Sequence, residues 1–194
     1  MSTLSSSGRR PEKMDIFWGE IAPCEHLVQL YDDGEAFLDA LEGFIGGGLA
    51  AGDGTVVIAT EAHLDALAMR LIASGANPQA AAARNQYIAL RADETLATFI
   101  VDGWPDEARF REVMGAILAR AREGGRKVRA FGEMVALLWM DGNREAVVRL
   151  EQLWNDLCRQ EGFSLFCAYP KLGFSQNASL SARDIFALHS RIVS

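Results

Sequence analysis

The chain has 194 residues, of which 49% are hydrophobic, and it carries a formal net charge of -7 at pH 7. This length and apolar content favour a single globular domain with a sizeable core. The acidic balance and the scattered Lys and Arg residues argue against nucleic acid or an anionic membrane surface as the main partner, because both bind clustered cations.

The sequence shows no export or membrane signal. Its three cysteines form no Cys-x-x-Cys pair, a usage typical of a reducing compartment. The N-terminal residues lack the apolar stretch of a signal peptide, and nowhere do about 18 apolar residues follow one another. We therefore expect a cytoplasmic protein.

Apolar runs and helical segments alternate along the chain. Residues 1–15 are rich in Ser and poor in apolar side chains, which predicts a disordered tail, and residues 16–194 form the predicted domain. Five short apolar runs have the character of strands: HLVQLY, TVVIAT, YIAL, VRAFG and SLFCAY. Between and after them, apolar residues at helical spacing predict helices over 35–52, 61–72, 94–100, 110–121, 147–158 and 179–192, with a short helical turn opened by Asn77 and Pro78. This alternation predicts an α/β fold with a mainly parallel central sheet flanked by helices.

Polar residues follow the apolar runs. In open parallel sheets, ligands bind in the crevice beyond the carboxyl ends of the strands, where the connecting loops gather. We therefore predict a ligand-binding crevice whose residues act by hydrogen bonding and ligand positioning. Its predicted lining residues are Tyr31, Glu61, His63, Asp93, Glu133 and Tyr169, with His26 as a weaker member.

Glu133 is the most suggestive of these residues. It ends the VRAFG run and precedes the apolar residues Leu137 to Trp139. An apolar border can raise the pKa of a carboxyl group and make it a hydrogen-bonding or proton-transfer group. Alternatively, Glu133 is a helix N-terminal acid stabilised by the free amides at the start of VALLWM. Both interpretations stay open at the level of sequence.

Nucleotide-binding motifs are absent. The glycines from Gly47 to Gly52 resemble those of a phosphate-binding loop, but Asp53 stands where that loop needs its Lys. They also precede a strand, whereas the glycines of a dinucleotide fingerprint follow one. This argues against ordinary ATP hydrolysis and predicts a loose helix end and turn instead.

The sequence also predicts no metal site and no catalytic residue. Cys24 and His26 are two residues apart, and His63 and His189 are distant, so no known zinc spacing is matched. A site built from His26, His63 and either Glu61 or Glu133 stays open as an alternative. No Gly-x-Ser-x-Gly element is present, and the apolar surroundings of Cys158 and Cys167 predict inert thiols.

Several segments together resemble one protein family. They are FWGEIAPCEHLVQLYDD, GLAAGDGTVVIATEAHL, ETLATFIVDGWPDEARF, VRAFGEMVALLW, LEQLWNDLC and FSLFCAYP. In this order they resemble the MEDS domain, the sensory domain of methanogen and methylotroph signalling proteins and of a dichloromethane-responsive regulator. The GEM element at residues 132–134, together with His26 and Tyr31, is the most specific part of the resemblance.

The resemblance implies a RecA/KaiC-like three-layer sandwich without a working phosphate loop. It also implies a sensory input module of the kind that accompanies histidine kinases, as in two-component systems, or DNA-binding regulators. It assigns no catalytic residue and no cofactor. No kinase or helix-turn-helix segment follows Ser194, and we therefore expect a stand-alone module that relays to a separate kinase or transcriptional regulator.

The expected function is thus non-enzymatic sensing of a small apolar or one-carbon-derived ligand, or of a nucleotide remnant, at the strand ends. Two alternatives remain. One is a degenerate nucleotide-dependent enzyme with Glu61 or Glu133 as general base. The other is a pure protein–protein interaction module with Trp104 or Phe17 exposed. Self-association into a homo-oligomer is left open.

Overall fold

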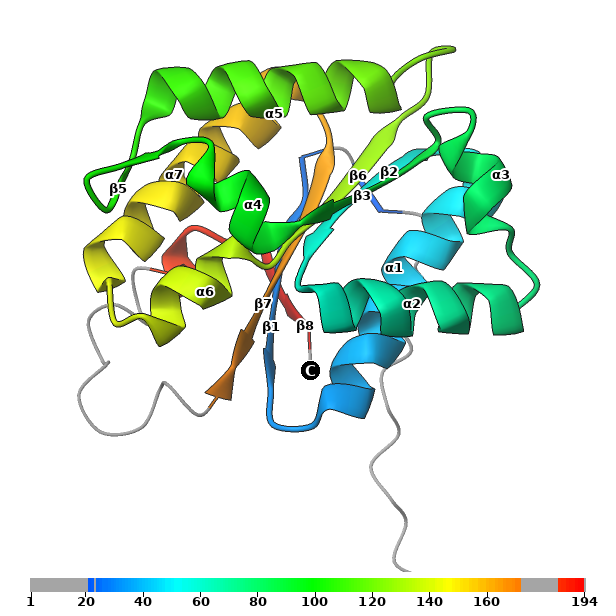
Figure 1. Ribbon diagram of the computed structural model, residues 1–194, viewed down its shortest axis with the longest axis horizontal. Helices are drawn as coiled ribbons and strands as arrows, with labels where there is room; N and C mark the ends of the chain where they lie inside the picture. The colour runs from blue at the N-terminus through cyan, green and yellow to red at the C-terminus, as the bar shows by residue number, and fades with distance from the viewer. Residues whose placement is uncertain (1–20, 23, 172–184, 194) are drawn as a thin grey trace, which may run out of the picture.

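A computed structural model describes residues 21–22, 24–171 and 185–193 (Figure 1). Within these ranges, six parallel strands form one sheet in the order β3-β2-β6-β7-β1-β8. Their bounds are β1 His26–Tyr31, β2 Gly54–Ala59, β3 Tyr87–Arg91, β6 Val128–Gly132, β7 Ser164–Pro170 and β8 Arg191–Val193. Two short strands, β4 Ile100–Val101 and β5 Trp104–Pro105, pair as an antiparallel hairpin. The predicted tail over residues 1–15 lies outside the described residues, and a single domain over 16–194 stays a prediction.

Helices cover both faces of the sheet (Figure 1). One layer consists of α1 Gly34–Ala51, α2 Glu61–Ala73 and α3 Pro78–Ala82. The opposite layer consists of α4 Ala92–Ala97, α5 Glu107–Ala121, α6 Met134–Met140 and α7 Arg144–Glu161. The α/β fold with a mainly parallel sheet, predicted from the alternation of apolar runs, is therefore confirmed, and so is the three-layer sandwich that the family resemblance implied.

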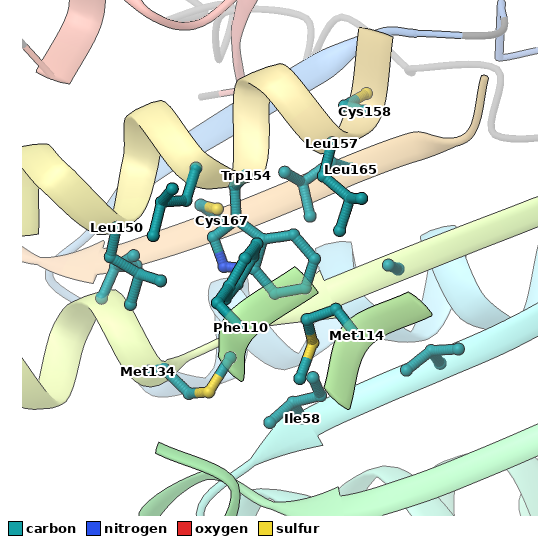
Figure 2. Close-up of a cluster of buried hydrophobic side chains, with 14 of the residues drawn as sticks. Ile58, Phe110, Met114, Met134, Leu150, Trp154, Leu157, Cys158, Leu165 and Cys167 are labelled. Atoms are coloured by element: carbon teal, nitrogen blue, oxygen red, sulfur yellow. The ribbon is translucent and has the colours of Figure 1, made fainter. Parts of the chain in front are cut away.

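The strands are apolar on both sides because both faces of the sheet are covered. Successive side chains in a strand point to opposite faces. In β2, Val56 and Ile58 thus join the core beneath α5 and α7, and Val57 joins the core beneath α1 and α2. The first of these cores contains Phe110 and Trp154, whose rings meet edge to face at 5.1 Å (Figure 2). The helices are thereby held against both faces of the sheet.

The order of the strands creates a branching point between β2 and β6. The connection after β2 runs through α2 and α3 on one face to β3, whereas the connection after β6 runs through α6 and α7 on the other face to β7. Where the connections of two adjacent parallel strands diverge in this way, their carboxyl ends border the crevice that usually binds ligands. The topology therefore favours the carboxyl ends of β2 and β6 as the place for a ligand.

The glycines of residues 46–48 lie inside α1, in agreement with the helix predicted over 35–52. Helix α1 continues to Ala51 and is closed by Gly52, whose φ is 81°. Gly48 lies against the sheet, where a Cβ atom would come within 2.9 Å of both Arg129 Cδ and Thr55 Cγ2. The glycine thus allows close approach of helix and sheet.

The predicted closing helix over 179–192 is wrong at its end. Residues 191–193 form β8, which pairs with β1 on the edge of the sheet, and residues 179–184 of that prediction lie outside the described part of the chain. Pairing with β1 gives partners to backbone groups that an edge strand would leave unpaired, and this outweighs helical spacing in so short a segment. Similarly, the helix expected over 94–100 ends at Ala97, and the GWP segment lies in the β4–β5 hairpin.

Candidate functional site

Glu133 joins the carboxyl ends of β6 and β2. It directly follows β6, and its own N–H donates to the carbonyl of Ile58 in β2 at 2.8 Å. Its side chain is almost completely buried, and the two carboxylate oxygens have different partners. Oε2 accepts from the backbone N–H of Thr60 at 2.8 Å, and Oε1 lies 2.8 Å from Nδ1 of His63. The carboxylate therefore connects β6 with the first turn of α2, across the branching point of the sheet.

This geometry decides against one sequence-based interpretation of Glu133. The residue stands at the N-cap of α6, but its side chain makes no capping hydrogen bond there. It accepts instead from Thr60, the N-cap residue of α2, whose own side chain makes no capping bond. The amide that stabilises the carboxylate thus belongs to a helix distant in sequence. A negative charge at this position is also favoured by the dipole of α2.

Two aromatic side chains extend the site toward β1. Tyr31 is the last residue of β1, and its ring stacks on Phe37 of α1 with centroids 4.7 Å apart. Phe37 is buried and meets the imidazole of His63 edge-on at 4.9 Å. Burial, and secondarily the charge of Glu133, raise the pKa of Tyr31 to about 12. Tyr31 therefore keeps its hydroxyl proton at neutral pH.

Glu61 and Asp93 lie on an exposed rim. Arg91, the last residue of β3, pairs with Glu61 and with Asp93, each at 2.8 Å. A hydrogen bond from Arg91 lowers the pKa of Asp93. Ion pairs between such exposed side chains contribute little to the stability of the fold. The carboxylates of Glu61 and Asp93 are accessible to solvent, and the ion pairs that they form are with Arg91.

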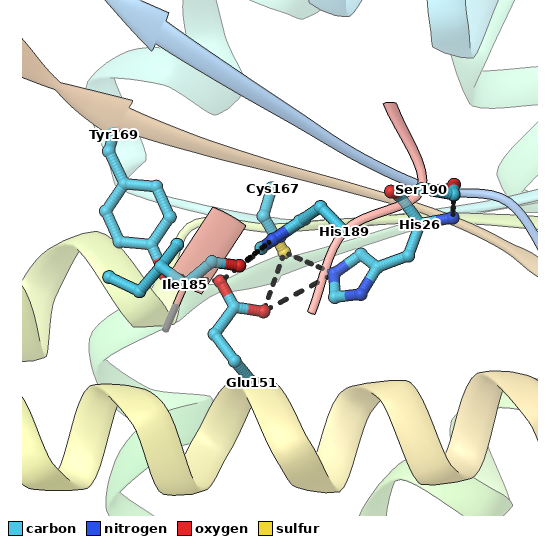
Figure 3. Close-up of polar contacts among 7 residues, drawn as sticks. All are labelled: His26, Glu151, Cys167, Tyr169, Ile185, His189 and Ser190. Atoms are coloured by element: carbon cyan, nitrogen blue, oxygen red, sulfur yellow. Dashed lines mark hydrogen bonds and ion pairs between the residues drawn. The ribbon is translucent and has the colours of Figure 1, made fainter. Parts of the chain in front are cut away.

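The structure places the remaining two predicted residues, His26 and Tyr169, on the opposite face of the sheet (Figure 3). Tyr169 is fully buried, and its hydroxyl donates to Oε1 of Glu151 in α7. Burial, and then the charge of Glu151, raise the pKa of Tyr169 well above its usual value. His26 begins β1 at its amino end, with Nε2 at 3.3 Å from Oε2 of Glu151. Of the seven predicted residues, the structure thus brings together Tyr31, His63 and Glu133, which we call the strand-end site.

Sequence reasoning missed two residues that contact the predicted side chains, Phe37 beside Tyr31 and Glu151 beside Tyr169. Phe37 looked like an ordinary member of the apolar face of its helix. Glu151 did carry a signal, since it occupies the position between Val147 and Trp154 on the buried face of α7. A carboxylate in such a stripe needs polar partners from another element.

Comparison with known proteins identifies one matching family model. The model is that of MEDS, the MEthanogen/methylotroph, DcmR Sensory domain, and it matches residues 25–190. No curated protein sequence matches the chain. Among the described residues, no helix combines the length and the apolar character that crossing a membrane requires.

Proposed function

Because the chain belongs to the MEDS sensory-domain family, we propose that it is a non-enzymatic sensor that binds a small ligand at the strand-end site. The signal would pass to a histidine kinase or transcriptional regulator in the cytoplasm. The observation that carries this proposal is the meeting of Tyr31, His63 and Glu133 beside the branching point of the sheet. Glu61 and Asp93 would border the entrance.

The polar groups of the site indicate the chemistry of the ligand. Because the carboxylate of Glu133 accepts, Nδ1 of His63 donates, and Nε2 is the ring nitrogen left for a ligand. Tyr31 offers an O–H donor, and Phe37 supplies an apolar wall. The side chain of His63 is 27% exposed, which supports access from solvent. These features fit a small ligand with one hydroxyl-like polar group and an apolar remainder.

The same contacts suggest how binding is relayed. Glu133 is bonded to the first turn of α2 through both Thr60 and His63. A ligand that engages His63 changes the hydrogen bonding of this carboxylate, and with it the support of the helix N-terminus. Helix α2 is therefore the element that we expect to respond first.

The first prediction concerns Glu133→Gln. Hydrogen bonds to charged groups are worth about 1.5–3 kcal/mol. Loss of the charge-assisted bond that orients His63 should therefore weaken ligand retention by about ten-fold or more. Native and denaturing mass spectrometry of protein purified from its own host would report any non-covalent mass. The matched control is Glu107→Gln, since Glu107 lies on α5 in exposed ion pairs with Arg111 and Arg149.

A non-covalent mass retained equally in Glu133→Gln and Glu107→Gln would remove Glu133 from the proposal. A clean apo mass in the unchanged protein would instead favour the interaction module. One observation favours that second candidate: Trp104 in the β4–β5 hairpin is 45% exposed. The other residue named for it, Phe17, lies outside the described residues.

A further inference from the structure

A second buried polar cluster lies on the face of the sheet opposite the strand-end site (Figure 3). It consists of His26, Glu151, Cys167 and His189, which come from β1, α7, β7 and the segment before β8. The side chains of Glu151 and His189 are fully inaccessible, and that of His26 is 2% exposed. One nitrogen, oxygen or sulfur atom from each residue lies within 4.8 Å of the corresponding atoms of the others.

Three distances within this cluster are close to the edges of a coordination tetrahedron. With metal–nitrogen or metal–oxygen bonds of about 2.0–2.1 Å and one metal–sulfur bond of about 2.3 Å, tetrahedral geometry sets donor atoms about 3.3–3.6 Å apart. Nε2 of His26 is 3.3 Å from Oε2 of Glu151 and 3.4 Å from Sγ of Cys167. Sγ of Cys167 is 3.7 Å from the same Oε2, and Nε2 of His189 is 3.5 Å from Oε1. Nε2 of His26, Sγ of Cys167 and Oε2 of Glu151 thus form a triangle of nearly tetrahedral size, and Nε2 of His189 faces the other oxygen of the same carboxylate.

The tautomer of His189 supplies independent evidence for a cation. Nδ1 of His189 lies 2.6 Å from the carbonyl oxygen of Ile185, and because a carbonyl can only accept, Nδ1 carries the hydrogen. In the neutral ring, Nε2 therefore holds a lone pair, and this buried atom has no hydrogen-bond partner. It faces Oε1 of Glu151 at 3.5 Å. Two electron-rich atoms that face each other in a dry interior require a proton or a metal ion near both.

The surroundings of His189 resemble those of a metal ligand. Histidines that bind metals usually donate their other ring N–H to a backbone carbonyl or carboxylate, which fixes the ring and its tautomer. The bond from Nδ1 to Ile185 has this role. In addition, the hydroxyl of Tyr169 donates to Glu151, as outer partners of a ligating carboxylate do.

We infer that His26, Glu151, Cys167 and His189 form a binding site for a single divalent transition-metal ion, with Zn²⁺ as the best match. Two imidazoles, a thiolate and a carboxylate are donors that Zn²⁺ accepts, whereas Mg²⁺ and Ca²⁺ require oxygen ligands. Four protein ligands describe a closed, structural site. The ion would tie the segment before β8 to β1, β7 and α7. This inference is independent of the strand-end site and does not rest on the proposed function.

Cobalt provides the direct test on the unchanged, untagged chain. Protein stripped with a chelator is titrated with Co²⁺ and followed by absorption spectroscopy. We expect one Co²⁺ per chain, with tetrahedral d–d bands and a thiolate-to-cobalt charge-transfer band, displaced by Zn²⁺ and unaffected by Mg²⁺. The absence of stoichiometric binding, or a spectrum without the thiolate band, would overturn the inference and leave a proton shared between His189 and Glu151.

The chain contains its own matched controls, because it has three histidines and three cysteines. Loss of a partner that only supports a ligand costs about 10–100-fold in metal affinity. We therefore expect Cys167→Ser and His189→Gln to weaken Co²⁺ binding at least about 100-fold. Cys24→Ser, Cys158→Ser and His63→Gln should retain both the stoichiometry and the spectrum. An unchanged thiolate band in Cys167→Ser would contradict the assignment.

A stability measurement keeps the inference testable if the ligand variants fail to fold. An ion that binds only the native state at 100 times its Kd should raise the Tm of the unchanged chain by about 5–10 °C. Mg²⁺ at the same concentration should leave the Tm unchanged. An equal shift with both ions, or with neither, would overturn the site.

Discussion

At the scale of single residues, the central feature is how one carboxylate organises the strand-end site. Glu133 has both oxygens engaged, by the backbone of Thr60 and by the imidazole of His63. In the proposed function, a ligand would therefore contact Nε2 of His63 and the hydroxyl of Tyr31, and the buried carboxylate of Glu133 would fix the orientation of His63 for this contact.

Gly48 and Gly115 form a matched pair for testing close packing. Both lie inside helices, where Ala is more favourable than Gly by about 1 kcal/mol. A Cβ at Gly115 meets nothing within 4 Å, whereas one at Gly48 would lie 2.9 Å from Thr55 and from Arg129. Arg129 has little freedom to move, because its guanidinium pairs with Asp53 at 2.8 Å in a buried position.

We therefore expect opposite outcomes for the two alanine substitutions. Gly115→Ala should raise the free energy of unfolding by about 0.5–1 kcal/mol. Gly48→Ala should lower it by about 1–3 kcal/mol, the usual cost of overpacking. Urea unfolding of both variants measures the difference, and equal stabilisation by both would contradict the close approach of α1 to the sheet.

At the scale of elements, the helices differ in how their first amides are satisfied. Asp106 caps α5 with its side chain, which accepts from the N–H of Arg109 at 2.9 Å. Thr60 makes no such bond at α2, where Glu133 accepts from the N–H of Thr60 instead. The start of α2 is therefore supported from another element, and the start of α5 is supported locally.

This contrast predicts unequal costs for removing the two cap side chains. Asp106→Ala should lower the free energy of unfolding by about 0.5–2 kcal/mol, since it loses a capping hydrogen bond. Thr60→Ala removes no such bond and should cost clearly less. Chemical denaturation compares them, and a cost for Thr60→Ala as large as that for Asp106→Ala would show that the hydroxyl supports α2 after all.

At the scale of the whole molecule, the three-layer arrangement raises the pKa of the tyrosine side chains by partial or complete burial. The chain has three tyrosines, and burial is the main cause of a raised pKa in each. The pKa is about 12 for Tyr31 and Tyr87 and well above its usual value for Tyr169. In an unfolded chain, tyrosines ionise near pH 10.

The raised values predict a loss of stability at high pH. Between about pH 10 and 12 the unfolded chain has lost phenolic protons that the folded chain retains, so the free energy of unfolding falls as the pH rises. Phenolate absorbance of the native protein should stay low through pH 10 and increase together with unfolding. In denaturant it should increase near pH 10. Ionisation of one tyrosine near pH 10 with an intact circular dichroism spectrum would contradict this prediction.

Local patterns were sufficient for the class of fold and for much of the element order. Asn77 and Pro78 open α3 as predicted, with Asn77 accepting from the N–H of Ala80. The apolar runs became buried parallel strands, because period-two burial on both faces is encoded within each run. The same periodicity separates His26 from Tyr31, since an odd spacing of five residues in a strand places them on opposite faces.

Tertiary structure alone decided which strand ends became neighbours. Insertion of β6 between β2 and β7 brought Glu133 to Thr60 and His63, which lie 73 and 70 residues away. The four-residue cluster likewise joins positions as distant as His26 and Cys167, 141 residues apart. Such contacts depend on strand order and on the register of whole elements. Local propensity and spacing do not contain that information, because the free energy that selects it comes from burying both faces of the completed sheet.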